Sequence, residues 1–123
     1  MKDVTMISEK TPKVHRPVQK NEYSITCATR KTPLVLNKTK KYTIGRLTKN
    51  TITLPQKTTS DLHASIKWEK SSFWIKDENS TNGTYVNDKR VNTKQSLADG
   101  DKVKIGKYVI QFHVKKIRVK KTV

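Results

Sequence analysis

Short runs of β-branched and aromatic residues recur along most of the chain and are separated by turn-forming residues. The clearest run is 64–69, where Ala64, Ile66 and Trp68 alternate with polar residues, so one face of an extended strand meets a core and the other meets water. Further strands are expected at 23–29, 34–36, 42–46, 52–54 and 73–77. No segment has the period of an amphipathic helix, and the spacing of the runs predicts an all-β sandwich or barrel.

The second half of the chain has its own turns and one change of register. Asn82-Gly83 and Asn87-Asp88 tolerate the positive φ of tight connections between strands. Toward the C-terminus, apolar residues occupy even positions up to Val114 and odd positions from Ile117. This pattern predicts either a bulge near Lys115-Lys116 or the end of the packed strand at that point.

The length of 123 residues suits about one domain. The first 20 residues show no strand or helix period, and Pro12 and Pro17 interrupt any regular element, so we predict a flexible N-terminal arm at 1–20. The strand-like pattern predicts a folded domain at 21–116 and a basic C-terminal tail at 117–123. No apolar run resembles a signal peptide or a membrane span, so we expect an intracellular protein without a membrane partner.

A formal charge of +17 makes phosphorylated protein, nucleic acid and anionic lipid all credible partners, and charge alone does not choose among them. The single cysteine, Cys27, excludes an intramolecular disulfide and is most simply a small buried hydrophobe. The three histidines are scattered without completing ligands, so no metal site and no cofactor are expected.

Catalytic chemistry lacks its minimal parts in this sequence. No serine lies in a nucleophile elbow and no glycine-rich loop precedes a helix, so we predict no catalytic residues and no enzyme. The carboxylates of Asp77-Glu78 fall in an apparent turn and are expected to be solvated.

Three short blocks at strand boundaries carry the candidate chemistry: Gly45-Arg46, Ser60-Asp61-Leu62-His63 and the segment 80–87. A phosphate needs charge-assisted donors, and the Arg46 guanidinium with the hydroxyls of Ser60 and Thr81 would supply them. Asn82 adds an amide that can both donate to and accept from an extended peptide backbone. This combination favours a phosphorylated peptide over a bare anion.

In this order the blocks resemble the signature of the forkhead-associated (FHA) domain family, which runs Gly-Arg, then Ser-x-x-His, then Asn-Gly-Thr followed by a hydrophobic residue and Asn. The resemblance spans about 23–114. It implies a β-sandwich of two antiparallel or mixed sheets with binding loops at one end. It also implies a phosphothreonine-dependent protein-binding module, an adaptor or scaffold for a phosphorylated partner.

Carried over by position, the resemblance assigns roles to seven residues. It implies that Arg46 and Ser60 bind the phosphate with Thr81 assisting, that Asn82 binds the ligand main chain, and that Gly45, His63 and Gly83 shape the site. The residue after the serine is often Asn, Arg or Lys in the family, whereas this chain has Asp61. This carboxylate would lower affinity unless it caps a backbone N–H or pairs with a basic neighbour such as Lys57.

The family resemblance further implies a preference for phosphothreonine over phosphoserine. The third residue after the phosphothreonine would be recognised by variable loops, here 49–59 and the region around Asn79. Lys49 and Lys57 favour an acidic residue at that position.

Two other hypotheses stay open. Lys38-Lys40-Lys41 and the basic residues of 115–121 would bind nucleic acid through its phosphates, with a weak or vestigial peptide pocket. The same residues are also typical of a solubilising or nuclear-targeting segment, which favours a nuclear location. Phosphorylation of Thr5 or Thr11 would let a second copy enter the pocket and form a phosphorylation-dependent dimer.

Overall fold

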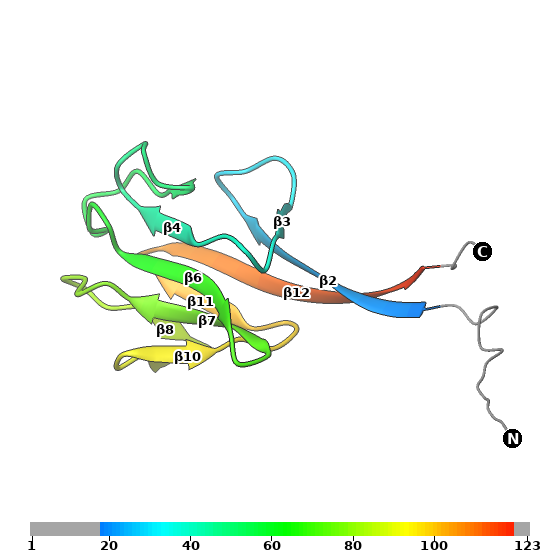
Figure 1. The fold of residues 1–123 in the computed structure, drawn as a ribbon. Coiled ribbons are helices and arrows are strands. Elements are labelled where there is room, and N and C mark those ends of the chain that lie inside the picture. The colour runs from blue at the N-terminus through cyan, green and yellow to red at the C-terminus, as the bar shows by residue number, and fades with distance from the viewer. Residues whose placement is uncertain (1–17, 120–123) are drawn as a thin grey trace, which may run out of the picture. The chain divides into compact units, whose positions relative to one another are not determined.

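The structure, a computed structural model, describes residues 18–119, and within them it contains two β-sheets and no helix (Figure 1). The strand order is β10-β7-β6-β4-β5 in the five-stranded sheet and β3-β2-β12-β11-β8-β9 in the six-stranded sheet. Most of the expected arm, with Thr5 and Thr11, lies outside the described residues. Along 18–119, nothing has the length and apolar character of a membrane-crossing helix. The prediction of an all-β sandwich is confirmed.

The strands are short except for two. The five-stranded sheet consists of β4 (Tyr42–Gly45), β5 (Ile52–Thr53), β6 (Ala64–Glu69), β7 (Ser72–Asp77) and β10 (Lys94–Ser96). The six-stranded sheet consists of β2 (Val18–Cys27), β3 (Leu34–Leu36), β8 (Tyr85–Val86), β9 (Lys89–Arg90), β11 (Lys102–Ile105) and β12 (Tyr108–Val119). The β4–β5 pair is parallel, whereas β4 pairs with β6 in the antiparallel sense, so the five-stranded sheet is mixed.

Two long strands depart from the expected boundaries. β2 begins at Val18 rather than at Tyr23, so the last residues of the segment expected as an arm belong to a strand. β12 continues to Val119 and does not stop at Lys115, the position where the apolar residues change from even to odd. The strand therefore continues past this point, although Lys115 and Lys116 are both exposed.

The core is built from apolar side chains of both sheets, including Ile25, Ile44, Ile66, Phe73 and Phe112, each at most 1% exposed. Phe73 also joins an aromatic cluster with Tyr23, Trp68 and Phe112, whose ring centroids lie 5.0 to 6.1 Å apart. Cys27 is buried in the same core, as expected for a small hydrophobe.

The alternation predicted for 64–69 is only partly present. Ala64 and Ile66 are buried and Lys67 is exposed, but Ser65 is buried as well, because its hydroxyl donates a 2.7 Å hydrogen bond to Glu78 Oε2. Trp68 is only partly buried, and the Lys38 ammonium lies 4.4 Å from the centre of one of its rings. Polar contacts at Ser65 and Trp68 therefore modify the simple inside–outside pattern.

Thr59, in the loop before β6, is 1% exposed, and its hydroxyl oxygen has no hydrogen-bond partner among the described residues. A buried polar group without a partner destabilises the folded state. We expect Thr59→Val, which removes the hydroxyl and keeps the shape, to raise the free energy of unfolding by about 1 kcal/mol, measured by urea denaturation.

The same substitution at Thr84 is the matched control. Thr84 is fully buried, but its hydroxyl donates a 2.7 Å hydrogen bond to Asp77 Oδ1. Thr84→Val should therefore lower the free energy of unfolding by about 1–3 kcal/mol. A loss of stability in both variants would show that the Thr59 hydroxyl is not an unsatisfied group.

Candidate functional site

Three connecting segments meet around an open cavity of about 480 Å³. Its lining consists of Arg46, Lys57, Thr58, Thr59, Ser60, Asp61, Leu62, Asn79, Thr81 and Asn82. The structure thus gathers all four residues that the sequence assigns to ligand contact, together with Lys57, Asp61 and Asn79. Lys49 is exposed and does not line this cavity. Gly45, His63 and Gly83 are buried and lie outside the lining.

Arg46 follows the end of β4 and is held beside the 60–61 segment by backbone pairing. Its N–H donates to the Ser60 carbonyl at 2.9 Å. Its side chain donates from Nε and Nη2 to one oxygen of Asp61, at 3.1 and 2.5 Å. Of the two alternatives for Asp61, a capped backbone N–H or a basic neighbour such as Lys57, the structure shows the second, and the basic neighbour is Arg46 because the backbone pairing brings the two residues together. The two side chains are 45% and 55% exposed, so a ligand can reach both.

Gly45 allows this close approach of β4 to the 60–61 segment. A Cβ at Gly45 would lie 2.2 Å from the Asp61 carbonyl oxygen and 2.6 Å from Asn50 Nδ2, which are impossible contacts. Asn50 is itself buried, and its Nδ2 donates to the carbonyls of Leu47 and Asp61 at 2.9 and 2.7 Å. Sequence reasoning missed Asn50, because a single Asn in a polar loop gives no signal of burial.

His63 lies behind the cavity and connects two of its walls. Its Nδ1 accepts a 3.0 Å hydrogen bond from the Ser60 N–H, so the ring proton is on Nε2, which donates to the Gly83 carbonyl at 2.8 Å. The imidazole is fully buried. One side chain therefore fixes the distance between the Ser60 segment and the 80–83 segment.

The cavity-lining residues of these two segments also contact each other directly. The Thr81 N–H donates to Ser60 Oγ at 3.1 Å, which orients the hydroxyl. Asn82 Nδ2 donates to the Thr58 carbonyl at 2.9 Å. A primary amide has a second hydrogen and an acceptor oxygen, so Asn82 is anchored while keeping groups suited to a peptide main chain.

Asp77 organises the 80–84 segment from the end of β7. Its carboxylate accepts hydrogen bonds from the Ser80 N–H at 3.1 Å, the Ser80 hydroxyl at 2.6 Å and the Thr84 hydroxyl at 2.7 Å. Burial alone would raise the pKa of Asp77, but the hydrogen bonds from Ser80 and Thr84 lower it below the usual 3.8. The expectation of a solvated Asp77 is therefore wrong. The Asp-x-x-Ser spacing, typical of local side-chain capping, was the available signal.

The site has the character of an anion and peptide-backbone binder. It presents the Arg46 guanidinium, the Ser60 hydroxyl oriented by the Thr81 N–H, and the anchored Asn82 amide on one surface. Across residues 18–119, no group of three or more His, Cys, Asp or Glu side chains is placed to hold a metal ion.

Comparison with known proteins gives one consistent match. A family model of the FHA domain matches residues 42–106, more than half of the chain. The oxoglutarate dehydrogenase inhibitor of Corynebacterium diphtheriae is 40% identical over 70 residues, covering 57% of this chain and 48% of that protein. The glycogen accumulation regulator GarA of Mycobacterium tuberculosis is 41% identical over 68 residues, covering 55% of this chain and 41% of that protein.

Solved structures agree with these sequence matches. A structure from a structural and functional analysis of phosphothreonine-dependent FHA domain interactions superposes with a TM-score of 0.66 and 29% identity. The match covers 75% of this chain and 95% of that chain. By contrast, the chain spans less than half the length of the two curated relatives.

The hydrogen bonds to Asp77 predict a pH-dependent contribution to stability. A group whose pKa is lowered by folding stabilises the folded state above its unfolded pKa, and that stabilisation is lost as the pH falls through the folded-state pKa. We expect Asp77→Asn to lower the free energy of unfolding by about 1–3 kcal/mol near neutral pH. The difference in the free energy of unfolding between Asp77→Asn and wild type should shrink as the pH falls below 3.8, the ordinary pKa of an aspartate. Urea denaturation across pH checks this, and an equal difference at about pH 7 and about pH 2.5 would contradict it.

Proposed function

Because the chain belongs to the FHA domain family, we propose that it is a phosphothreonine-dependent protein-binding module that acts by recognition, without catalysis of its own. The observation that carries this proposal is the single cavity that joins Arg46, Ser60, Thr81 and Asn82. The partner is a phosphorylated protein, and a second copy phosphorylated at Thr5 or Thr11 is one such partner.

The proposed role of each residue follows from the chemistry of its side chain. The Arg46 guanidinium and the Ser60 hydroxyl donate to the phosphate oxygens, with Thr81 beside them. Asn82 uses the part of its amide not engaged with Thr58 to hold the ligand main chain. Phosphate recognition and peptide recognition thus come from adjacent residues of one surface.

Asp61 competes with the phosphate for the Arg46 guanidinium. Its carboxylate is engaged by the same guanidinium that a phosphate would use. The pair is solvent-exposed, and exposed ion pairs contribute only about 0–1 kcal/mol, so a doubly charged phosphate can displace the carboxylate. Asp61 therefore weakens the site without closing it.

A preference for phosphothreonine over phosphoserine would come from apolar contact with the threonine methyl. Leu62 is 42% exposed and lines the cavity, so it offers such contact. Burial of one methyl contributes roughly 0.8 kcal/mol, so the expected discrimination by burial alone is about fourfold. Stronger discrimination would require that the methyl also fixes the phosphate orientation.

The test of the proposal is Arg46→Ala, with fluorescence anisotropy of a threonine-peptide library in phosphorylated and unphosphorylated forms at physiological salt. We expect micromolar binding, about −8 kcal/mol, that needs the phosphate and is lost in the variant. Leu47→Ala, which alters the exposed neighbour of Arg46, is a control that should retain binding. Single-stranded nucleic acid is added as a competitor.

A different result would favour the nucleic-acid alternative. In this result, binding would not depend on Arg46, its affinity would fall steeply as the salt concentration rises, and nucleic acid would displace the peptide. The lysine-rich segments would then be the functional surface. In that case the cavity would not be a phosphopeptide site.

The role of Asp61 gives a second prediction. Asp61→Asn removes the competing charge while keeping a side chain of the same shape, so phosphopeptide affinity should rise by about three- to tenfold in the same assay. Asp99→Asn is the matched control, because Asp99 is also exposed but does not line the cavity, and affinity there should change less than about twofold. Unchanged or weaker binding by Asp61→Asn would show that the ion pair does not oppose the phosphate.

A further inference from the structure

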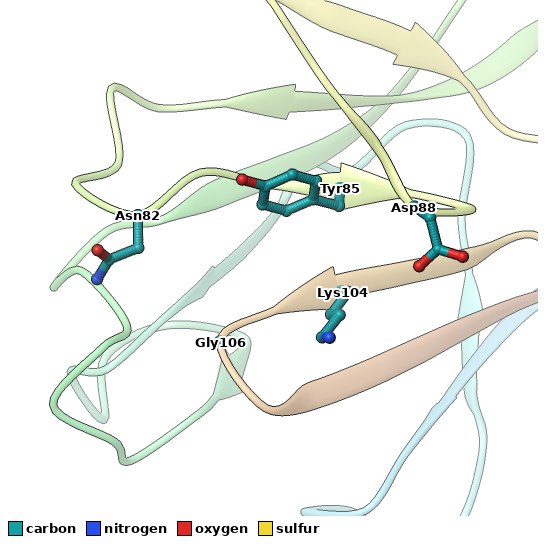
Figure 2. Close-up of a pocket in the computed structure, with 5 residues that line it drawn as sticks. All are labelled: Asn82, Tyr85, Asp88, Lys104 and Gly106. Atoms are coloured by element: carbon teal, nitrogen blue, oxygen red, sulfur yellow. The ribbon is translucent and has the colours of Figure 1, made fainter.

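A second pocket, of about 410 Å³, lies against β8 and β11 and shares one residue with the proposed phosphopeptide cavity (Figure 2). It is lined by Asn82, Tyr85, Asp88, Lys104 and Gly106. Asn82 also lines the cavity that contains Arg46. A ligand whose main chain is held at Asn82 therefore has the phosphate site on one side and this pocket on the other.

The strand pairing explains why these side chains face outward together. Tyr85 of β8 and Lys104 of β11 are direct partners in the antiparallel ladder, and the neighbouring pair, Val86 and Val103, is buried. Because side chains alternate across a strand, Tyr85 and Lys104 project from the opposite face. Figure 2 shows them side by side, with the Tyr85 hydroxyl directed toward Asn82.

The two ends of the pocket are fixed by turns. Asn87 and Asp88 both have positive φ, 48° and 71°, and form the tight turn that places Asp88 at the end away from Asn82 (Figure 2). At the other end, a Cβ on Gly106 would lie 2.7 Å from Thr58 Oγ1, so the β11–β12 turn packs directly on the loop that anchors Asn82. The pocket and the phosphopeptide cavity are thus connected by packed loops and form one continuous surface.

The chemistry of the pocket differs between its ends. The Tyr85 hydroxyl is directed toward Asn82, and the exposed Lys104 lies farther along the pocket, between Asn82 and Asp88 (Figure 2). Both side chains can donate to a carboxylate. Asp88, at the far end, repels a second negative charge there. A basic ligand side chain that entered the pocket from the Asn82 end would reach Lys104, which repels it, before it reached Asp88. The charges therefore favour a single acidic side chain between Asn82 and Lys104, away from Asp88.

We propose that the Tyr85–Lys104 pocket is a subsite for an acidic side chain of the same phosphorylated ligand, on the side of Asn82 away from Arg46. This inference rests on the proposed function. It places ligand selection on the strand pair β8–β11, in addition to the loops 49–59 and the region of Asn79 that the sequence indicated.

The experiment compares phosphothreonine peptides that have alanine at every flanking position with a series in which one glutamate replaces alanine at each position in turn. A matching glutamine series separates charge from size. Binding is measured by fluorescence anisotropy to wild type, Lys104→Glu and Lys104→Gln. We expect one glutamate position to raise wild-type affinity by about three- to tenfold, and both variants to lose this preference.

Lys102→Glu is the matched control, because Lys102 is exposed on the same strand but does not line the pocket. It changes the net charge by the same amount as Lys104→Glu, and it should keep the glutamate preference. A preference that falls equally in both variants would reflect the general field of the protein and would overturn the subsite.

The outcomes also separate the two proposals. If the all-alanine phosphopeptide binds and requires Arg46 but no glutamate position matters, the proposed function stands and the subsite is wrong. If no phosphopeptide binds at all, the proposed function fails and the subsite fails with it. Circular dichroism of the exposed-strand variants checks that each is folded.

Discussion

The geometry of the site depends on one buried imidazole. His63 accepts from the Ser60 N–H and donates to the Gly83 carbonyl, so one ring joins two backbone groups that are 23 residues apart in sequence. Both contacts require the neutral ring with its proton on Nε2. Without them, the Ser60 hydroxyl and the Thr81 N–H would have no reason to stay within 3.1 Å of each other. The polar groups that face the cavity are therefore positioned by a buried residue that does not line it.

The Gly45-Arg46 segment is held in place by steric constraints as well as by hydrogen bonds. Arg46 reaches the cavity because the backbone at Gly45 lies against the Asp61 carbonyl, where no Cβ fits, and because Asn50 satisfies that carbonyl from inside. Since these groups are buried and paired, moving Arg46 would leave polar atoms unsatisfied. Binding therefore begins from a site whose backbone is already fixed, which reduces the entropy lost on association.

Sequence reasoning predicted the fold, the residues that the cavity gathers and some of the supports behind them, but not all of these supports. β3 and β6 have the predicted bounds because apolar residues define them, whereas β9 and β10 are polar edge strands without a readable period. Gly45, His63 and Gly83 were found because they belong to a spaced motif. Asn50 was missed, and Asp77 was wrongly expected to be solvated. The importance of both residues comes from burial and hydrogen bonding that only the folded chain creates.

The charge of the chain and the charge of the site act differently. The formal charge of +17 produces a field that attracts phosphorylated protein and nucleic acid alike and raises the rate of encounter with either. In the cavity itself, Asp61 offsets Arg46, and Lys57 is the remaining charged side chain in the lining. For the proposed function, selection must therefore come from the positioned polar groups of Ser60, Thr81 and Asn82, because net positive charge cannot distinguish one phosphate-bearing partner from another.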